Sequence, residues 1–447
     1  MKTSSLPRLF AAAALAAVGV VSPVSAASSA PVSLRVEFDR PMLPADEVQR
    51  AIVKIALEGC RHDRPAERQP VNLVIVLDRS GSMGGEKIIR ARDAAIEALH
   101  RLDRRDMFSV VIFDHEVSTL ISPQSPTDAA WLERQIHSVT ARGNTALFAG
   151  VSQGAAELRK NLERSGFVHR VLLLSDGEAN VGPSSPDDLG RLGAALRREG
   201  ISVTTVGLGE GFNEDLMTAL AQRSDGNHYF VAESGDLARI FAAELGDVLN
   251  VVAQQIVVNI EFPEGVRVIR PIGREAECHG REVSFSLNQL YGGQEKFLLV
   301  EVEVPAAKEN VVRTVARARA RFAETSGGPV CELVAEGQVR TTRNEALVLR
   351  EANQKLQADY ASNVIAEAKT KAVALADSGR RQEAAAVMRQ TGVSLGSLGA
   401  SYSNAPVMQA AAEAKKEAEE VEKDGIDNRK RKAMRADSYR TTNQQQN

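Results

Sequence analysis

The sequence predicts an α/β domain with a doubly wound, mostly parallel sheet, which is inserted in an antiparallel β-sandwich and followed by a C-terminal helical region. Three observations lead to this prediction. Apolar strands alternate with amphipathic helices from Val71 to Leu249, which is the pattern of crossovers between parallel strands. Strand-like segments with no helix between them lie on both sides of this block. After Asn344 the composition turns to Ala, Glu, Lys, Arg and Gln, which are mostly good helix formers.

Within the α/β block, predicted over residues 69–250, each strand is a short apolar run and each helix repeats its apolar residues at helical spacing. The expected strands are Val71–Asp78, Phe108–Phe113, Val117–Ile121, Val168–Ser175, Ser202–Gly207 and His228–Val231. The expected helices are Glu86–Leu102, Asp128–Val139, Leu147–Glu163, Pro186–Arg198, Asn213–Ala221 and Gly235–Leu249. Only Asp114–Glu116 separates the second strand from the third, so the third is expected to be an antiparallel partner at the sheet edge.

The flanking segments, 30–68 and 251–342, are expected to form one sandwich, because the few strands before the α/β block cannot stand alone. Their expected strands are Val32–Phe38, Ala51–Leu57, Gln255–Phe262, Val266–Pro271, Val283–Leu287, Lys296–Val304, Val312–Phe322 and Glu332–Arg340. A helical hairpin is predicted over 343–392. The remainder, 393–447, is predicted to hold a Gly- and Ser-rich linker at Leu395–Ala405, a polar helix at Gln409–Glu422, and a disordered tail with the basic cluster Arg429–Lys432.

The first 26 residues carry the pattern of a secretory signal peptide. Lys2 and Arg8 precede a short apolar run, and small residues end at Ala26. We therefore predict cleavage after Ala26 and a periplasmic or secreted protein. The apolar run is too short to span a bilayer, and we expect no transmembrane segment later in the chain.

Charge and cysteine content narrow the possible functions. With 55 basic and 58 acidic residues the formal net charge is −3, which does not suit a nucleic-acid partner. The three cysteines, Cys60, Cys278 and Cys331, allow at most one internal disulfide and lack the C-x-x-C spacing of a zinc site. A Cys278–Cys331 pair is slightly preferred, because both residues lie in the later β segment, although a bond to Cys60 stays open.

Five oxygen-bearing side chains are expected at one edge of the predicted sheet. Asp78 ends an apolar strand, and Ser80 and Ser82 follow it at alternate positions on a loop that contains Gly81. Asp176 ends a second apolar strand, and Thr145 lies in a Gly-rich loop before a helical segment. Open α/β sheets bind ligands at the carboxyl ends of their strands, and a set of hard oxygens without His or Cys suits Mg²⁺. We therefore predict a Mg²⁺ or Mn²⁺ site made of these five residues.

This motif resembles the metal-ion-dependent adhesion site of von Willebrand factor type A domains, with all five positions filled, and the resemblance covers about Val71 to Leu249. The arrangement of the whole chain also resembles exported bacterial proteins of the calcium-activated-chloride-channel-like group. The resemblance implies a metal-dependent protein-binding module, in which an open position on the ion accepts an acidic side chain of a partner protein. Glu178 is expected at the rim of the site, where it would select ligands.

Two other functions remain open from the sequence. A Mg²⁺-dependent hydrolase would use the ion as a Lewis acid and Glu178 as the general base. A purely structural envelope protein would use the metal only to hold the loops together. We expect no enzyme and assign no catalytic residue, because no histidine is spaced for a nucleophile triad and Thr119 breaks the H-E-x-x-H pattern that begins at His115.

The predicted final helix of the α/β block, Gly235–Leu249, runs almost directly into the strand Gln255–Phe262. A ligand at the metal would pull on the β domain if it shifted this helix. The size of such an effect is limited by the difference in the ligand's affinity for the shifted and unshifted conformations. A fixed connector is the other interpretation and the one we favour.

Overall fold

The structure is a computed structural model, and it describes residues 31–60, 69–164, 166–176, 179–232, 236–248, 250–324 and 328–445. The predicted signal peptide lies outside the described residues, and so does Glu178. Among the residues that are described, no helix is both long enough and apolar enough to cross a membrane.

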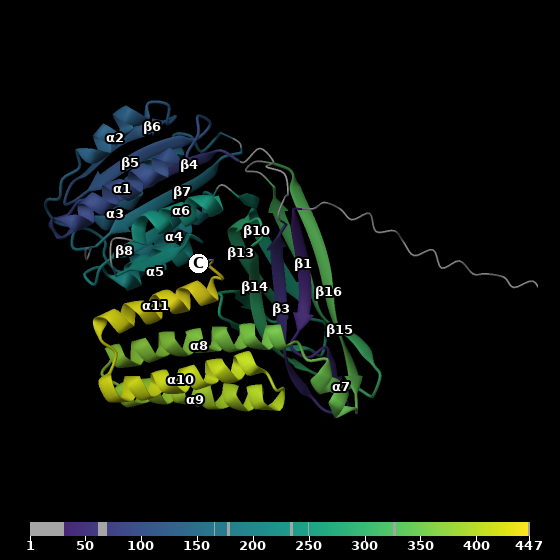
Figure 1. The fold of residues 1–447 in the computed structure, drawn as a ribbon. Coiled ribbons are helices and arrows are strands. Elements are labelled where there is room, and N and C mark those ends of the chain that lie inside the picture. The colour runs from purple at the N-terminus through teal and green to yellow at the C-terminus, as the bar shows by residue number, and fades with distance from the viewer. Residues whose placement is uncertain are drawn as a thin grey trace, which may run out of the picture. The chain divides into compact units, whose positions relative to one another are not determined.

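The α/β domain is built on a six-stranded sheet (Figure 1). Its strands, in spatial order, are β6 (Val117–Gln124), β5 (Met107–Phe113), β4 (Val71–Asp78), β7 (Val168–Ser175), β8 (Ile201–Leu208) and β9 (His228–Val231). All pairs are parallel except β5 with β6, which form the antiparallel edge predicted from their short connection. Every residue of the central strands β4, β7 and β8 is buried, as expected of a parallel sheet covered on both faces.

Helices cover both faces of this sheet, so alternate residues of each strand enter two different cores. Leu73, Ile75 and Leu77 of β4 pack in one core, and Val74 and Val76 pack in the other. The first core includes residues of α1 (Glu86–His100), α2 (Ala129–His137) and α6 (Leu237–Val248). The second includes residues of α3 (Leu147–Arg159), α4 (Pro186–Arg198) and α5 (Glu214–Arg223).

The β-sandwich is assembled from strands that lie before and after the α/β domain in the sequence. One sheet has the order β1 (Val32–Phe38), β3 (Gln49–Gly59), β14 (Glu295–Val304) and β11 (Arg267–Ile272). The other has the order β12 (Glu277–His279), β13 (Glu282–Tyr291), β10 (Val251–Glu261), β15 (Val312–Ala323), β16 (Val330–Thr342) and β2 (Met42–Pro44). Because β3 pairs with β14 and β2 pairs with β16, the α/β domain is inserted in the sandwich, and the predicted fold class is confirmed.

The C-terminal region contains five helices where the sequence predicted a hairpin, a linker, one polar helix and a tail. They are α7 (Glu345–Arg350), α8 (Gln354–Asp377), α9 (Arg381–Ser401), α10 (Ala405–Asp424) and α11 (Asn428–Thr442). Most of the predicted linker is the last part of α9. A glycine of this segment allows a close approach of α10, because a Cβ at Gly399 would lie only 3.0 Å from the backbone nitrogen of Met408 on α10. Small residues that looked like a flexible connection therefore form a helix contact.

The predicted disordered tail is wrong over its described part, because α11 is helical and lies between α8 and the α/β domain (Figure 1). Lys432 donates a hydrogen bond to the carbonyl oxygen of Phe212 (2.6 Å) and forms an ion pair with Glu214, the first residue of α5. Both charged side chains are buried. Arg431 and Lys432 of the basic cluster are thus paired with acidic residues that lie far away in the sequence.

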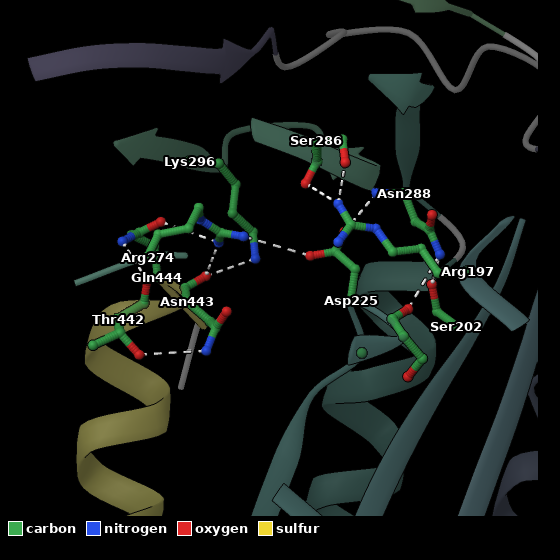
Figure 2. A network of polar contacts seen from close by, with 12 residues as sticks. Arg197, Ser202, Asp225, Arg274, Ser286, Asn288, Lys296, Thr442, Asn443 and Gln444 are labelled. Carbon is green, nitrogen blue, oxygen red and sulfur yellow. Dashed lines mark hydrogen bonds and ion pairs between the residues drawn. The ribbon is translucent and has the colours of Figure 1, made fainter. Parts of the chain in front are cut away.

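Polar contacts join the α/β domain to the sandwich (Figure 2). Arg197 of α4 donates to the carbonyl and hydroxyl oxygens of Ser286 on β13. The amide of Asn288, also on β13, donates to the hydroxyl of Ser202 on β8 (3.0 Å). These contacts hold one end of β8 against the sandwich.

The C-terminus takes part in the same junction (Figure 2). Arg274 forms a 3.6 Å ion pair with Asp225, and its guanidinium donates to the carbonyl oxygen of Asn443 (3.1 Å). Lys296 of β14 donates to the same carbonyl oxygen (2.7 Å). Asn443, which directly follows α11, therefore contacts β14 of the sandwich through Lys296. It also contacts Arg274, which pairs with Asp225 of the α/β domain.

The predicted Cys278–Cys331 disulfide is wrong, since Cys60, Cys278 and Cys331 are all free. Cys278 lies on β12 and Cys331 on β16, and three strands separate them in one sheet. Neighbouring strands are about 4.8 Å apart, whereas the two Cα atoms of a disulfide lie within about 7 Å of each other. The sequence shows that both residues belong to β segments but not their order in the sheet.

Candidate metal centre

The predicted site residues lie at the carboxyl ends of two neighbouring central strands. Asp78 is the last residue of β4, and Asp176 directly follows β7. Ser80 and Ser82 lie on the turn between β4 and α1, and Thr145 lies two residues before α3 begins. The parallel pairing of β4 with β7 places the two aspartates at the same edge of the sheet.

Hydrogen bonds connect the two carboxylates through the two serine hydroxyls. The backbone N–H of Ser80 donates to Oδ1 of Asp78 (2.7 Å), and the hydroxyl oxygens of Ser80 and Ser82 are 3.0 Å apart. Ser82 donates from its hydroxyl to Oδ1 of Asp176 (2.8 Å). Ser175, the last residue of β7, donates to the other oxygen of Asp78. Four of the five predicted residues therefore form one continuous cluster.

Thr145 is held beside this cluster by backbone contacts between the loops. Its N–H donates to the side-chain oxygen of Asn180 (2.9 Å), and its carbonyl oxygen accepts from the N–H of Asn180 (3.2 Å). The Thr145 loop is also tied to the serine turn, because the N–H of Gly81 donates to the carbonyl oxygen of Gly143 (2.9 Å). The sequence prediction missed Asn180, for which the only signal was an Asx residue shortly after the Asp176 strand.

The cluster concentrates negative charge where water has little access. The side chains of Asp78 and Asp176 are buried, as are Ser80 and Thr145, while Ser82 is exposed. Burial raises the pKa of Asp78 to about 6, and the nearby charge of Asp176 adds to this rise, against hydrogen bonds from Ser175 and Ser80. A buried carboxylate is costly unless a cation or hydrogen-bond donors compensate it. A divalent cation bound by these oxygens would compensate both aspartates, so the donor set fits the predicted ion.

One cation of the chain itself reaches the cluster. Lys87, the second residue of α1, donates from Nζ to Oδ2 of Asp176. The sequence prediction did not include Lys87, because its approach to Asp176 depends on the direction in which α1 leaves the serine turn.

A second group of possible metal ligands, Asp114, His115 and Glu116, lies after β5. Here the acids already have cationic partners: Arg79 and Arg142 each contact Asp114 at 2.9 Å, and Arg142 also contacts Glu116 at 3.2 Å. Burial raises the pKa of Asp114, but the N–H of Glu116 and the two arginines outweigh it, so the pKa is lowered. This group braces the loops around the cluster, and its charge needs no metal.

Comparison with protein families now identifies the inserted domain, because the model of the von Willebrand factor type A domain matches residues 72–243. These residues form a von Willebrand factor type A domain. The match covers the six-stranded sheet and most of its helices, and it leaves out the sandwich and the C-terminal helices. Type A domains commonly mediate protein–protein interactions.

Similar proteins extend the likeness over part of the chain. An uncharacterised protein of Synechocystis is 32% identical over 179 residues, which are 40% of this chain and 41% of that protein. The uncharacterised protein YfbK of Escherichia coli is 25% identical over 292 residues, 64% of this chain and 50% of that protein. Human inter-alpha-trypsin inhibitor heavy chain H3 is 25% identical over 174 residues, 37% of this chain and 20% of that protein. The chain thus spans half or less of the length of these curated relatives.

Solved structures share the fold beyond the type A domain. A von Willebrand factor type A protein from Catenulispora acidiphila superposes with a TM-score of 0.63 at 16% identity, over 82% of this chain and 89% of that one. The ArnB paralog VWA2 from Sulfolobus acidocaldarius superposes with a TM-score of 0.59 at 15% identity, over 93% and 99%. At such identities the likeness establishes the fold alone.

Proposed function

We propose that this protein is an exported, metal-dependent protein-binding module. In this proposal Asp78, Ser80, Ser82, Thr145 and Asp176 hold a Mg²⁺ or Mn²⁺ ion, and a carboxylate of a partner protein completes the coordination of the ion. The two aspartates supply the charge, and the hydroxyls supply neutral oxygens. The protein-interaction role that is common among type A domains supports a binding function.

One observation carries the proposal: serine hydroxyls link two buried carboxylates at the edge of the sheet. A bound ion would supply a positive centre for an incoming carboxylate. The chain's own residues would orient that ion, because the N–H of Ser80 and the hydroxyl of Ser175 fix the carboxylate of Asp78. Five oxygens are fewer than the six to eight that Ca²⁺ prefers, so Mg²⁺ should bind more tightly than Ca²⁺.

The first experiment is a calorimetric titration of the full chain with Mg²⁺ and Mn²⁺. Asp78→Ala should abolish binding, since it removes one of the two carboxylates. Asp93→Ala is the matched control, because Asp93 is an exposed carboxylate on α1. Undiminished affinity in Asp78→Ala would sink the site assignment.

The second experiment tests the binding role by affinity capture from envelope extract, with and without EDTA. A partner retained by the wild-type chain in Mg²⁺, and lost both in EDTA and with Asp78→Ala, is the expected result. Capture that ignores EDTA would contradict a metal-bridged contact. Turnover of a substrate by the metal-loaded protein would point to the hydrolase instead.

The exported location rests on the first 26 residues of the sequence. N-terminal sequencing of the mature protein should begin at Ala27. A mature protein that begins at Met1 in a membrane fraction would mean an uncleaved anchor.

A further inference from the structure

Lys87 lies where a cation is unfavourable unless it has an anionic partner. It is the second residue of α1, and the N-terminus of a helix carries partial positive charge. Its partner is Asp176: the ammonium binds Oδ2, while the hydroxyl of Ser82 binds Oδ1. Nζ also lies 3.4 Å from the carbonyl oxygen of Ser82. Both oxygens of Asp176 are therefore engaged, one by the hydroxyl of Ser82 and one by the ammonium of Lys87.

The surroundings of Lys87 allow its ammonium to move away from Asp176. The lysine side chain is 37% exposed, whereas the Asp176 side chain is fully buried. On its other side the Lys87 side chain passes Gly209, which directly follows β8. A Cβ atom added to Gly209 would lie 3.8 Å from Nζ of Lys87. The ammonium can thus turn to water when its ion pair with Asp176 is broken, whereas the buried carboxylate of Asp176 cannot.

We propose that Lys87 is a built-in competitor of the metal ion for Asp176, and that it sets the metal affinity of the site. The inference rests on the proposed function, since it concerns the same cluster. The ammonium and a divalent ion are drawn to the same buried carboxylate and repel each other at short range. Metal binding must displace or tolerate this ammonium, so the affinity is lower than the five oxygens alone would give. Occupancy then responds to the concentration of free divalent ion.

A purely structural ion pair would behave differently. If Lys87 only stabilised the fold, its removal would lower the free energy of unfolding and leave metal affinity unchanged. A lysine that helped to orient Asp176 for the metal would weaken binding when removed. Competition alone predicts that metal binds more tightly without the lysine.

The test is a calorimetric titration of the full chain with Mn²⁺ at low ionic strength, comparing wild type with Lys87→Gln and Lys87→Arg. Lys87→Gln should bind roughly tenfold more tightly, because the nearby positive charge is gone. Lys87→Arg keeps the charge and should stay within about twofold of wild type. Arg90→Gln is the matched control: Arg90 lies one turn further along α1, is about half exposed and pairs with Glu86, so the affinity should not change.

The outcomes separate this inference from the proposed function. If wild type binds Mn²⁺ and Lys87→Gln binds equally or less tightly, competition is overturned and the metal site stands. If no variant binds metal, both fail. Lys87→Met retains the aliphatic stem, and it replaces Lys87→Gln if thermal unfolding shows that the glutamine variant does not fold.

Discussion

Strand β7 carries a polar cluster near each of its ends, and the two clusters differ in how their charge is balanced. Near its beginning, Arg170 lies 3.3 Å from Glu244 of α6, and both side chains are buried. Arg170 also donates to Gln289 (2.7 Å) and to the hydroxyl of Tyr291 on β13. At the other end, two serine hydroxyls lie between Asp78 and Asp176, and one partly exposed lysine contacts Asp176.

The two clusters of β7 differ in whether their buried charges are compensated by partners within the chain. Burial lowers the pKa of Arg170, but Tyr291 and Glu244 more than offset this effect, so the pKa is raised and the charge is held. The carboxylate of Glu244 receives further hydrogen bonds from Thr204, Asn227 and Tyr229. By contrast, burial raises the pKa of Asp78 to about 6, the charge of Asp176 adds to this rise, and no cation is paired with Asp78 among the contacts of the described residues. A balanced cluster fixes the sandwich to the type A domain, and the unbalanced one is where we propose that a cation binds.

The largest effect is expected when the balanced cluster is broken. Arg170→Met leaves Glu244 buried without its counter-charge, so the free energy of unfolding should fall by about 3–5 kcal/mol. Urea denaturation measures this loss. Adding Glu244→Gln removes the stranded charge and should restore part of the stability, and a double variant that is no more stable than Arg170→Met would contradict the account.

A smaller loss is expected at α11. Lys432→Met removes one cation from buried Glu214, which keeps Arg431 as a second partner. The free energy of unfolding should therefore fall by about 2 kcal/mol, below the cost of stranding a charge completely. Lys430→Met is the control: it removes a partly exposed ion pair with Glu420, and the loss should stay below about 1 kcal/mol. Equal losses would mean that α11 is not docked through Lys432.

Acid should weaken the fold through buried His228. Burial, helped by nearby Lys432, lowers the pKa of His228 to about 4, from 6.5. Between these values the unfolded chain binds more protons than the folded one, so stability is fully present above pH 6.5 and is lost as the pH falls toward 4. At pH 5 the loss is about 2 kcal/mol. In NMR titration the ring signals of His228 should stay constant down to pH 5, and a midpoint near 6.5 would refute the argument.

The smallest stability effect is expected at the unbalanced cluster. Asp78→Asn in EDTA removes a buried charge and keeps an oxygen that can accept from the N–H of Ser80. The free energy of unfolding should change by less than about 1 kcal/mol or rise, while Mg²⁺ binding is lost. Thermal unfolding and calorimetry on the same sample measure both. A large loss of stability without metal would assign the cluster a structural role.

The sequence could place Asp78 and Asp176 at one edge of the sheet because the positions of these two residues depend on where strands end. Asp78 and Asp176 each follow a run of buried apolar residues, and parallel strands bring their carboxyl ends together. Whether these residues hold a metal stays a prediction. Lys87 was missed because a side chain that arrives from a helix needs the direction of that helix.

The C-terminal helices show a second limit. Helix α11 has few apolar residues, and its docking depends on ion pairs with Glu214 and Asp215. These two acids precede Arg431 by 217 and 216 residues in the sequence. Ion pairs between residues so far apart in the chain leave no pattern in the local sequence. The disulfide prediction failed for a related reason, because the spacing of apolar residues within a strand does not reveal the order of the strands in a sheet. The fixed connection between α6 and the sandwich, which the sequence analysis favoured over a movement on ligand binding, stays a prediction.

The insertion of the type A domain has a consequence for the order of folding. Strand β3 ends at Gly59, yet its neighbour β14 begins at Glu295, so the sandwich cannot close until the ribosome has made both. The inserted domain needs no strand from outside 71–248 for its sheet and can form first. Once folded, the inserted domain holds the chain that enters β4 close to the chain that leaves α6. The loop that must be closed when β3 pairs with β14 is then effectively shorter, and its closure costs less entropy. We expect the type A domain to be the nucleus on which the rest of the protein assembles.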